Sequence, residues 1–181
     1  MMVRLHRPTE ASIVGETERL RLRRLCERDA AFIVELLNDP DFLRYIGDRQ
    51  VRTEEDAVRY ILGGPIVSYE RYGFGLWRVE RTEDSEPIGI CGLLKREALA
   101  DVDIGFATLP RFRSQGYTFE SATTVMRWGK ERLGIRRIVA ITAPDNHASI
   151  RVLGKLGLAY ERTIRLPGET RDCCLFAPTG S

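Results

Sequence analysis

A glycine-containing turn from Arg113 to Thr118 has the residue types that bind a pyrophosphate. It follows a strand-like run, Asp101 to Leu109, and precedes a helix-like run that continues to Leu133. The start of a helix presents free backbone N–H groups and the positive end of its dipole to an anion. Gly116 lets the backbone approach a phosphate closely, and Arg113 would add a charge-assisted hydrogen bond. On this hexapeptide alone, an ordinary turn with one arginine in solvent is the simpler interpretation.

A second segment, Asn146 to Leu158, follows the strand-like run from Arg137 to Thr142 and contains Asn-x-x-Ser and then Lys-x-Gly-Leu. In order and spacing, the two segments together resemble the GNAT superfamily of acyl-CoA-dependent N-acyltransferases. The sequence Thr-Glu-Arg-Leu-Arg-Leu-Arg at Thr17 to Arg23 and the sequence Asp103 to Phe106 resemble its ribosomal-protein N-terminal acetyltransferase-like branch. The resemblance covers roughly residues 17 to 177, nearly one whole domain.

The resemblance implies acetyl-CoA as co-substrate, with its pyrophosphate on the turn and its thioester carbonyl on backbone N–H groups of the preceding strand. Thr118 departs from the family pattern, which usually has Gly or Ala there. A β-branched side chain narrows the room for phosphate oxygens or contributes a hydroxyl. The cofactor-binding residues implied in this way are Phe106, Ala107, Thr108, Arg113, Ser114, Gln115, Gly116, Tyr117, Thr118, Asn146 and Ser149.

Acyl transfer to an amine requires an acceptor for the amine proton and a donor for the leaving thiolate. The resemblance makes Asp103 the candidate general base beside the acceptor, although Asp101 shares its strand face and could exchange roles with it. A structural role for these carboxylates, in solvent or paired with an arginine, is equally good. Ser149 is the candidate acid, because Leu153 occupies the position where many members have tyrosine. The competing interpretation is that Asn146 and Ser149 only cap the following helix.

Strand-like runs account for most of the predicted sheet. Arg19 to Arg23 alternates strictly, which indicates a half-buried strand. Three runs between Phe74 and Leu109 have short connections, which favour an antiparallel meander. The turn, the long helix and the strand Arg137–Thr142 that follow would form a βαβ crossover with a parallel pair of strands. The other runs are Phe74 to Val79, Pro87 to Leu94, Val102 to Leu109, Ala159 to Arg165 and Arg171 to Phe176.

Apolar residues at helical spacing predict two helices between the first strand and the meander. The first carries Phe32 and Leu36 and stops at Asn38-Asp39-Pro40, and the second begins at a capping box from Thr53 to Asp56 and ends at Gly63-Gly64-Pro65. Tyr45 lies in the intervening loop, which in the family borders the acceptor pocket. Tyr45 is therefore a candidate acceptor-binding residue or, failing that, a core aromatic.

The predicted fold is α+β and of GNAT type. Its mixed, mostly antiparallel sheet has about six or seven strands flanked by about four helices. The resemblance implies that this sheet is splayed at the central parallel pair, where the cofactor enters. Residues 1–16 are expected to form an N-terminal arm, residues 17–177 a single domain, and residues 178–181 a C-terminal tail.

The composition is that of an ordinary globular protein. With 181 residues, 43% of them apolar and 30% charged, the chain can bury a core. A net charge of +2 indicates no nucleic-acid footprint, and no run is apolar enough to span a bilayer or serve as a signal peptide. The chain is thus expected to be cytoplasmic.

Cysteines and histidines offer little support for a metal site. Cys26, Cys91, Cys173 and Cys174 lack Cys-x-x-Cys spacing, and the histidines are His6 and His147. Adjacent Cys173 and Cys174 would face opposite sides of a strand, which favours reduced thiols over a disulfide. No metal cofactor is expected.

The leading hypothesis is an acetyl-CoA-dependent N-acetyltransferase acting on a primary amine of a peptide N-terminus or a small molecule. The alternative is an acyl-CoA-binding sensor without transfer activity, which Leu153 keeps open. A third reading, an RNA- or ribosome-binding module, would need clustered basic residues with interleaved aromatics, which the sequence lacks. The expected partners are acetyl-CoA and an amine acceptor, with no membrane or nucleic acid and with a homodimer left open.

Overall fold

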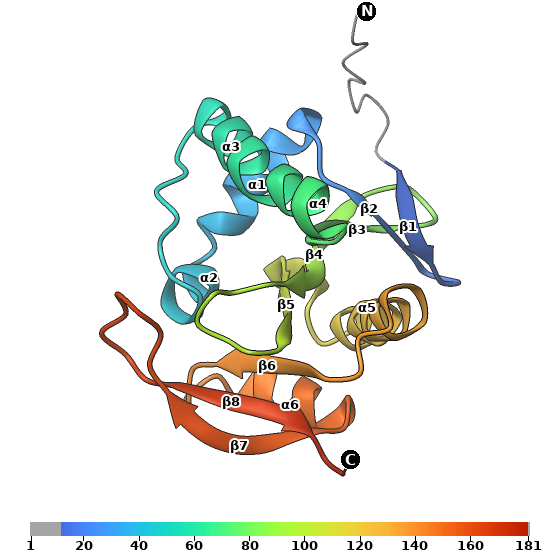
Figure 1. Cartoon of the computed structure of the whole chain (residues 1–181). Coiled ribbons are helices and arrows are strands. Elements are labelled where there is room, and N and C mark those ends of the chain that lie inside the picture. Colours follow the sequence, from blue (N-terminus) through green and yellow to red (C-terminus); the bar gives the residue numbers. More distant parts are fainter. Residues whose placement is uncertain (1–11, 181) are drawn as a thin grey trace, which may run out of the picture.

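One mixed sheet of eight strands organises the chain (Figure 1) in the computed structural model, which describes residues 12–180. The strands lie in the order β1-β2-β3-β4-β5-β6-β8-β7, and all neighbours are antiparallel except the central pair β5 and β6. The predicted mostly antiparallel sheet with one central parallel pair is confirmed. The strands are β1 (Ile13–Glu16), β2 (Leu20–Arg24), β3 (Leu76–Arg81), β4 (Pro87–Leu94), β5 (Val102–Thr108), β6 (Ile138–Thr142), β7 (Leu158–Ile164) and β8 (Cys173–Pro178).

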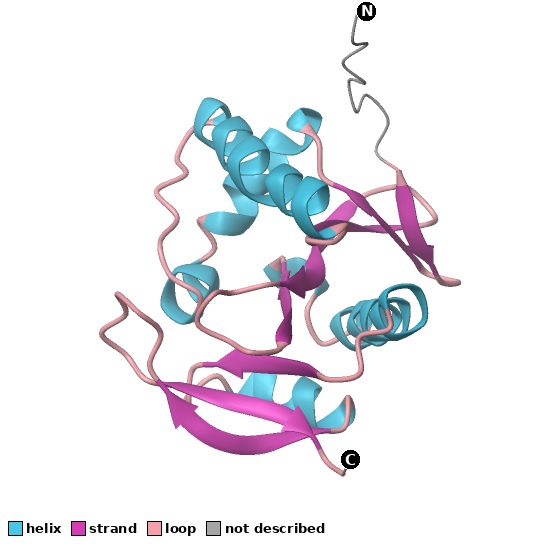
Figure 2. Ribbon diagram, in the orientation of Figure 1, coloured by secondary structure: helices cyan, strands magenta, loops and turns pink. Residues whose placement is uncertain are grey.

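Helices cover both faces of the sheet (Figure 2). The helices α1, α3 and α4 gather on one side of the β2–β5 half, α5 lies on the other side, and α6 packs beside β6 to β8. None of the helices within residues 12–180 is long and apolar enough to cross a membrane. The α-helices are α1 (Ala30–Leu37), α2 (Pro40–Tyr45), α3 (Glu54–Ile61), α4 (Val67–Tyr72), α5 (Tyr117–Leu133) and α6 (His147–Lys155).

One strand was not predicted from the sequence. Four residues, Ile13–Glu16, form β1 and pair with β2, inside the range that we expected to be an arm. The strand is short, lies at the edge of the sheet and is mostly exposed, so it lacks the alternation of apolar residues that marks a half-buried strand. This strand raises the count to eight, above the predicted six or seven.

Two helix predictions were wrong. Pro40 does not lead into a loop but occupies the first turn of α2, where a missing N–H costs nothing, and Asp39 caps that helix. The Gly63-Gly64-Pro65 sequence does not end α3 either. The chain continues through a π-helical turn, Leu62–Ile66, into α4 and stops only at Gly73, which is left-handed with φ of 78°. A wider π turn accommodates the proline, and the glycine provides the terminating conformation.

The parallel pair is held together over a very short length. Only Val102 with Ile138 and Asp103 with Val139 are in register between β5 and β6. Beyond them β5 stays paired with β4 as far as Thr108, while β6 turns to pair with β8 from Ala140 to Thr142. The facing edges of β5 and β6 therefore separate toward their carboxyl ends, and the predicted splay is confirmed.

Most of the hydrophobic core lies in one large cluster, which continues past the opening onto Ile138, Ala140, Leu153 and Phe176. This cluster also includes Leu22, Ile33, Trp77 and Val125, and Trp77 meets Trp128 edge to face at 4.8 Å between ring centroids. A second, smaller cluster packs on β6 and β8. Its buried members are Leu99, Val139, Leu175 and Ala177.

Candidate active site

The turn after β5 has the backbone conformation of an anion cradle. Ser114 and Gly116 are left-handed, with φ of 61° and 83°, and Gly116 directly precedes the first residue of α5. Within residues 12–180, the backbone N–H groups of residues 114 to 118 donate no hydrogen bond to the protein. Alternation of left-handed and helical residues points successive N–H groups to one side, where they bind an anion. The turn therefore presents the donors that the sequence analysis expected.

Arg19, which sequence reasoning did not single out, supports this turn from the bend just before β2. Its Nη1 donates to the Gln115 carbonyl at 3.2 Å, and its guanidinium lies over the Tyr117 ring at 4.7 Å. The same side chain forms an ion pair with Glu120, whose carboxylate also accepts from the Thr17 hydroxyl at 2.5 Å. The Thr17 to Arg23 motif thus has a structural role, which its alternation alone did not reveal.

The side chain of Arg113 has partners other than a phosphate. Its Nε donates to the Thr108 carbonyl at 2.9 Å, its Nη1 to Asp41 at 2.5 Å, and its Nη2 to Asp39. These contacts direct the guanidinium toward α2. The expectation that Arg113 donates to the pyrophosphate is not supported by its contacts.

The carboxyl end of β5 borders the opening of the sheet. Phe106, Ala107 and Thr108 are partly buried and pair with β4, while the opposite edge of these residues has no strand partner in the part of the chain that the structure describes. The Thr108 hydroxyl lies 2.8 Å from the hydroxyl of Thr118 in the first turn of α5. Thr118 therefore contributes a hydroxyl to the turn, and that hydroxyl is already hydrogen-bonded to Thr108.

Asp103 and Asp101 occupy different surroundings. Asp103 lies in β5, whereas Asp101 lies in the bend just before it, so the predicted shared strand face is not formed. Asp103 is 1% exposed. Each of its carboxylate oxygens accepts a hydrogen bond from Nε of Arg96 at 3.1 Å. Burial raises its pKa above that of an exposed aspartate, while the charge and hydrogen bond of Arg96 oppose the shift. Asp101 is partly exposed and accepts from Arg137 at 3.0 Å. Only Asp103 lies at the last paired position before β5 and β6 separate.

The start of α6 holds the second predicted pair. Asn146 is the N-cap, and its Oδ1 accepts from the Ser149 backbone N–H at 3.1 Å, as the capping interpretation expected. The Ser149 hydroxyl forms no hydrogen bond within the described residues. Leu153 is 1% exposed and packs in the main core, so it places no proton donor at the site.

Tyr45 is the last residue of α2, and this end of the helix reaches the same opening. Nη2 of Arg44 pairs with Asp145 at 2.9 Å, and Arg171 donates to the Arg44 carbonyl at 3.0 Å. The Arg44 guanidinium lies over the Tyr45 ring at 4.9 Å. Because Asp145 directly precedes Asn146, these contacts bring Tyr45 and the start of α6 to one place.

Parallel strands explain why these separate segments converge. The carboxyl ends of neighbouring parallel strands meet at one edge of a sheet, where ligands of open sheets bind. The turn at residues 114–118 follows β5, and Asn146 and Ser149 follow β6. The predicted cofactor residues therefore surround one opening, with Asp103 at its narrow end.

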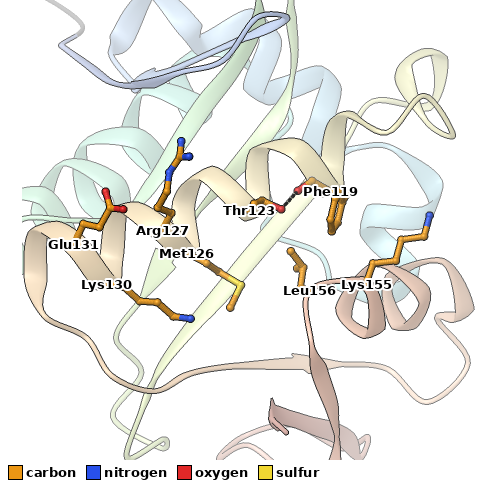
Figure 3. A pocket seen from close by; sticks show the side chains of 8 residues that line it. All are labelled: Phe119, Thr123, Met126, Arg127, Lys130, Glu131, Lys155 and Leu156. Carbon is orange, nitrogen blue, oxygen red and sulfur yellow. Dashed lines mark hydrogen bonds between the residues drawn. The ribbon is translucent and has the colours of Figure 1, made fainter. Parts of the chain in front are cut away.

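A cavity of about 400 Å³ lies outside this opening, between α5 and α6 (Figure 3). Its lining residues are Phe119, Thr123, Met126, Arg127, Lys130, Glu131, Lys155 and Leu156. None of the predicted site residues lines it, and it contains more cations than carboxylates. Among residues 12–180, no group of His, Cys, Asp or Glu side chains is arranged to hold a metal ion.

Comparison with known proteins agrees with this geometry. The Acetyltransferase (GNAT) domain family matches residues 19–159. The uncharacterized N-acetyltransferase YoaA of Bacillus subtilis is 32% identical over 154 residues, which are 83% of this chain and 85% of YoaA. The FsC-acetyl coenzyme A-N(2)-transacetylase of Aspergillus fumigatus is 27% identical over 81% of this chain and 65% of its own length.

The fold also matches solved structures. The ribosomal alpha-N-protein acetyltransferase RimL, in complex with coenzyme A, aligns with a TM-score of 0.77 and 23% identity over 92% of this chain and 97% of RimL. An acetyltransferase from Agrobacterium tumefaciens aligns with a TM-score of 0.77 and 18% identity over 98% of this chain and all of that one. The family match and the related sequences show that the chain belongs to the GNAT acetyltransferase family and is an acyltransferase that uses acetyl-CoA as co-substrate.

Proposed function

We propose that this enzyme transfers the acetyl group of acetyl-CoA to a primary amine, either a peptide N-terminus or a small-molecule amine, by direct attack. The observation that carries the proposal is the position of Asp103. It is a buried carboxylate at the narrow end of the opening, on the strand whose free edge would bind the thioester. A base at this position can receive the proton of an amine that attacks the carbonyl carbon.

Each step can be assigned to residues of this chain. The N–H groups of residues 114–118 bind the pyrophosphate. The Leu109 N–H donates to β4, so strand alternation points the N–H groups of Phe106 and Thr108 to the free edge, where they polarise the thioester carbonyl. The amine nitrogen forms a bond to the carbonyl carbon, its proton passes through water to Asp103, and the carbon–sulfur bond breaks. The thiolate takes a proton, for which Ser149 is the proposed donor.

The acid–base properties of the site favour an α-amine over a lysine side chain. An α-amine has a pKa of ~7.8 and lysine ~10.4, so about one α-amine in seven but fewer than about one lysine in a thousand is neutral at pH 7. That difference is about 3.5 kcal/mol. One carboxylate and a buried Leu153 at the usual tyrosine position supply little means of deprotonating lysine.

An acetylation screen tests the acceptor class. Thiol release from acetyl-CoA would be measured with peptides that carry a free α-amine, with the same peptides blocked at the N-terminus but containing lysine, and with small amines. We expect turnover with α-amines or small amines of low pKa. Acetylation confined to internal lysines would contradict the proposal.

Replacing Asp103 with asparagine tests the base. We expect kcat to fall about 100-fold or more, with little change in acetyl-CoA affinity. Because burial raises the pKa of Asp103, wild-type turnover should fall as the pH is lowered through that pKa and the base is protonated. The variant should lack this acidic limb, and its deficit should shrink as the pH approaches the pKa of the amine.

Asp101→Asn is the matched control, since it makes the same change two residues earlier, in the bend that precedes β5. We expect it to retain the wild-type pH profile. Equal turnover of Asp103→Asn and wild type at every pH would require a base elsewhere.

A further inference from the structure

The short helix α2 is attached at both ends to the segments that border the opening. At its start, Asp39 and Asp41 bind Arg113, which belongs to the segment between β5 and α5. At its end, Arg44 binds Asp145, which belongs to the segment between β6 and α6. Helix α2 therefore bridges the two separated halves of the sheet.

Of the two attachments, the one through Arg113 has more hydrogen bonds and is less exposed to solvent. All three guanidinium nitrogens have an acceptor, namely the Thr108 carbonyl, Asp41 and Asp39. The Asp39 side chain is 5% exposed and also accepts from the backbone N–H of Phe42, so the carboxylate that begins α2 is the one that Arg113 binds. The Arg44–Asp145 pair is more than half exposed, and such pairs contribute little.

Charge argues against a second use of Arg113 as a phosphate ligand. Two carboxylates lie against its guanidinium, so the local sum of Asp39, Asp41 and Arg113 is negative. A pyrophosphate within hydrogen-bond distance of that guanidinium would come close to both carboxylates and be repelled. The free N–H groups of residues 114–118 bind an anion without that repulsion.

We propose that Arg113 is a positioning residue that holds α2, and with it Tyr45, at the acceptor side of the opening. This inference rests on the proposed function, because it takes α2 to border the acceptor. The loss of Arg113 should then weaken use of the acceptor and leave binding of acetyl-CoA nearly unchanged. A phosphate ligand would behave in the opposite way.

The test compares Arg113→Ala with wild type by three measurements: acetyl-CoA affinity by calorimetry, acceptor KM for a peptide with a free α-amine, and hydrogen exchange of the α2 amides. We expect acetyl-CoA affinity within about twofold, acceptor KM raised about tenfold or more, and faster exchange in α2. Arg113→Lys, which keeps the charge but not the planar fork, should fall between the two.

Arg111→Ala is the matched control. Arg111 lies in the same segment and pairs with Glu35 and Glu86, away from α2. We expect this variant to behave like wild type in all three measurements.

Acetyl-CoA affinity weakened tenfold in Arg113→Ala, with α2 exchange unchanged, would overturn the proposal and make Arg113 a ligand. If the wild type acetylates no peptide, the proposed acceptor is wrong. The affinity and exchange measurements still decide what Arg113 does in that case.

Discussion

The two halves of the sheet, β1 to β5 and β6 to β8, are each paired over several residues per strand, whereas the junction between them is not. The strands β4 and β5 are in register over six residue pairs, from Gly89 with Thr108 to Leu94 with Asp103, whereas β5 and β6 share only two. Helices cover both faces of the first half, and most residues of the main core lie there. Stability is thus concentrated in continuous pairing, and the site is placed where pairing stops.

Buried aspartates in the two regions show the same contrast in their titration. Asp29, in the first half, is 1% exposed but receives hydrogen bonds from Arg23, Arg78 and the Cys26 backbone N–H. Burial would raise its pKa, yet these donors together lower it below the ordinary value. Asp103, equally buried at the junction, has Arg96 as its one side-chain donor within residues 12–180. Burial raises its pKa although Arg96, a backbone N–H and the charge of Lys95 oppose the shift. The number of donors decides whether a buried carboxylate is stabilised as an ion or left able to accept a proton.

The largest effect is expected from Gly92→Ala in the β1 to β5 half. A Cβ at this position would lie 1.9 Å from the Gly75 carbonyl oxygen and 2.7 Å from the Leu76 Cα, so the backbone itself would have to move. We expect a loss of about 4 kcal/mol or more in the free energy of unfolding, or no folding. Denaturant unfolding measures it.

Gly154→Ala, in α6 of the other half, is the control. A Cβ there meets nothing within 4 Å, and helix propensity predicts a gain of up to about 1 kcal/mol. If Gly92→Ala stayed within about 1 kcal/mol of wild type, the first half would be less rigid than its pairing indicates.

A smaller effect on stability, with a specific loss of function, is expected from Gly116→Val at the junction. A valine with φ of 83° is strained by about 1–2 kcal/mol. Relief of that strain would turn the N–H groups of the cradle away from the pyrophosphate. We expect acetyl-CoA affinity, measured by calorimetry, to fall about tenfold or more while the fold is retained.

Gly134→Val introduces comparable strain at the opposite end of α5, where φ is 64° and a Cβ meets nothing within 4 Å. It should lower stability similarly and leave acetyl-CoA affinity intact. Unchanged affinity in a folded Gly116→Val protein would remove the turn from the binding site.

The smallest effect is expected from Asn146→Ala in the second half. Loss of the cap on α6 should cost about 1 kcal/mol of stability. Thr53→Ala, which removes the side-chain cap of α3 in the first half, provides the reference for a cap with no ligand role. If Asn146 also lies beside the pantetheine arm, Asn146→Ala should weaken acetyl-CoA binding and Thr53→Ala should not. If neither variant changes acetyl-CoA affinity, Asn146 only caps α6.

Periodicity predicted the regular elements well and their irregular neighbours poorly. Strand β4 matches its predicted range, Pro87 to Leu94, because its residues and turns are typical of a strand. Helix α1 does end before Pro40, as predicted, but a new helix that begins at Pro40 was missed because proline was interpreted only as a stop. The π turn was missed for the same reason, since Pro65 lies inside it and the helix continues.

The site divides in a similar way. Its main-chain donors follow from a local motif, which a sequence shows directly. Its side-chain contacts do not: Arg19 and Glu120 are separated by 101 positions, and Arg113 and Asp39 by 74. No spacing rule connects residues so far apart, so the link between Arg113 and α2 could be found only from the fold.

The free edge of β5 has a consequence for how this enzyme can change over evolutionary time. The groups proposed to polarise the thioester are main-chain N–H groups of Phe106 and Thr108, and every residue type except proline provides one. Selection on these positions for catalysis would thus act against proline more than in favour of any particular side chain. Drift in the side chains can proceed there while the reaction is preserved, provided that the path of the strand does not change.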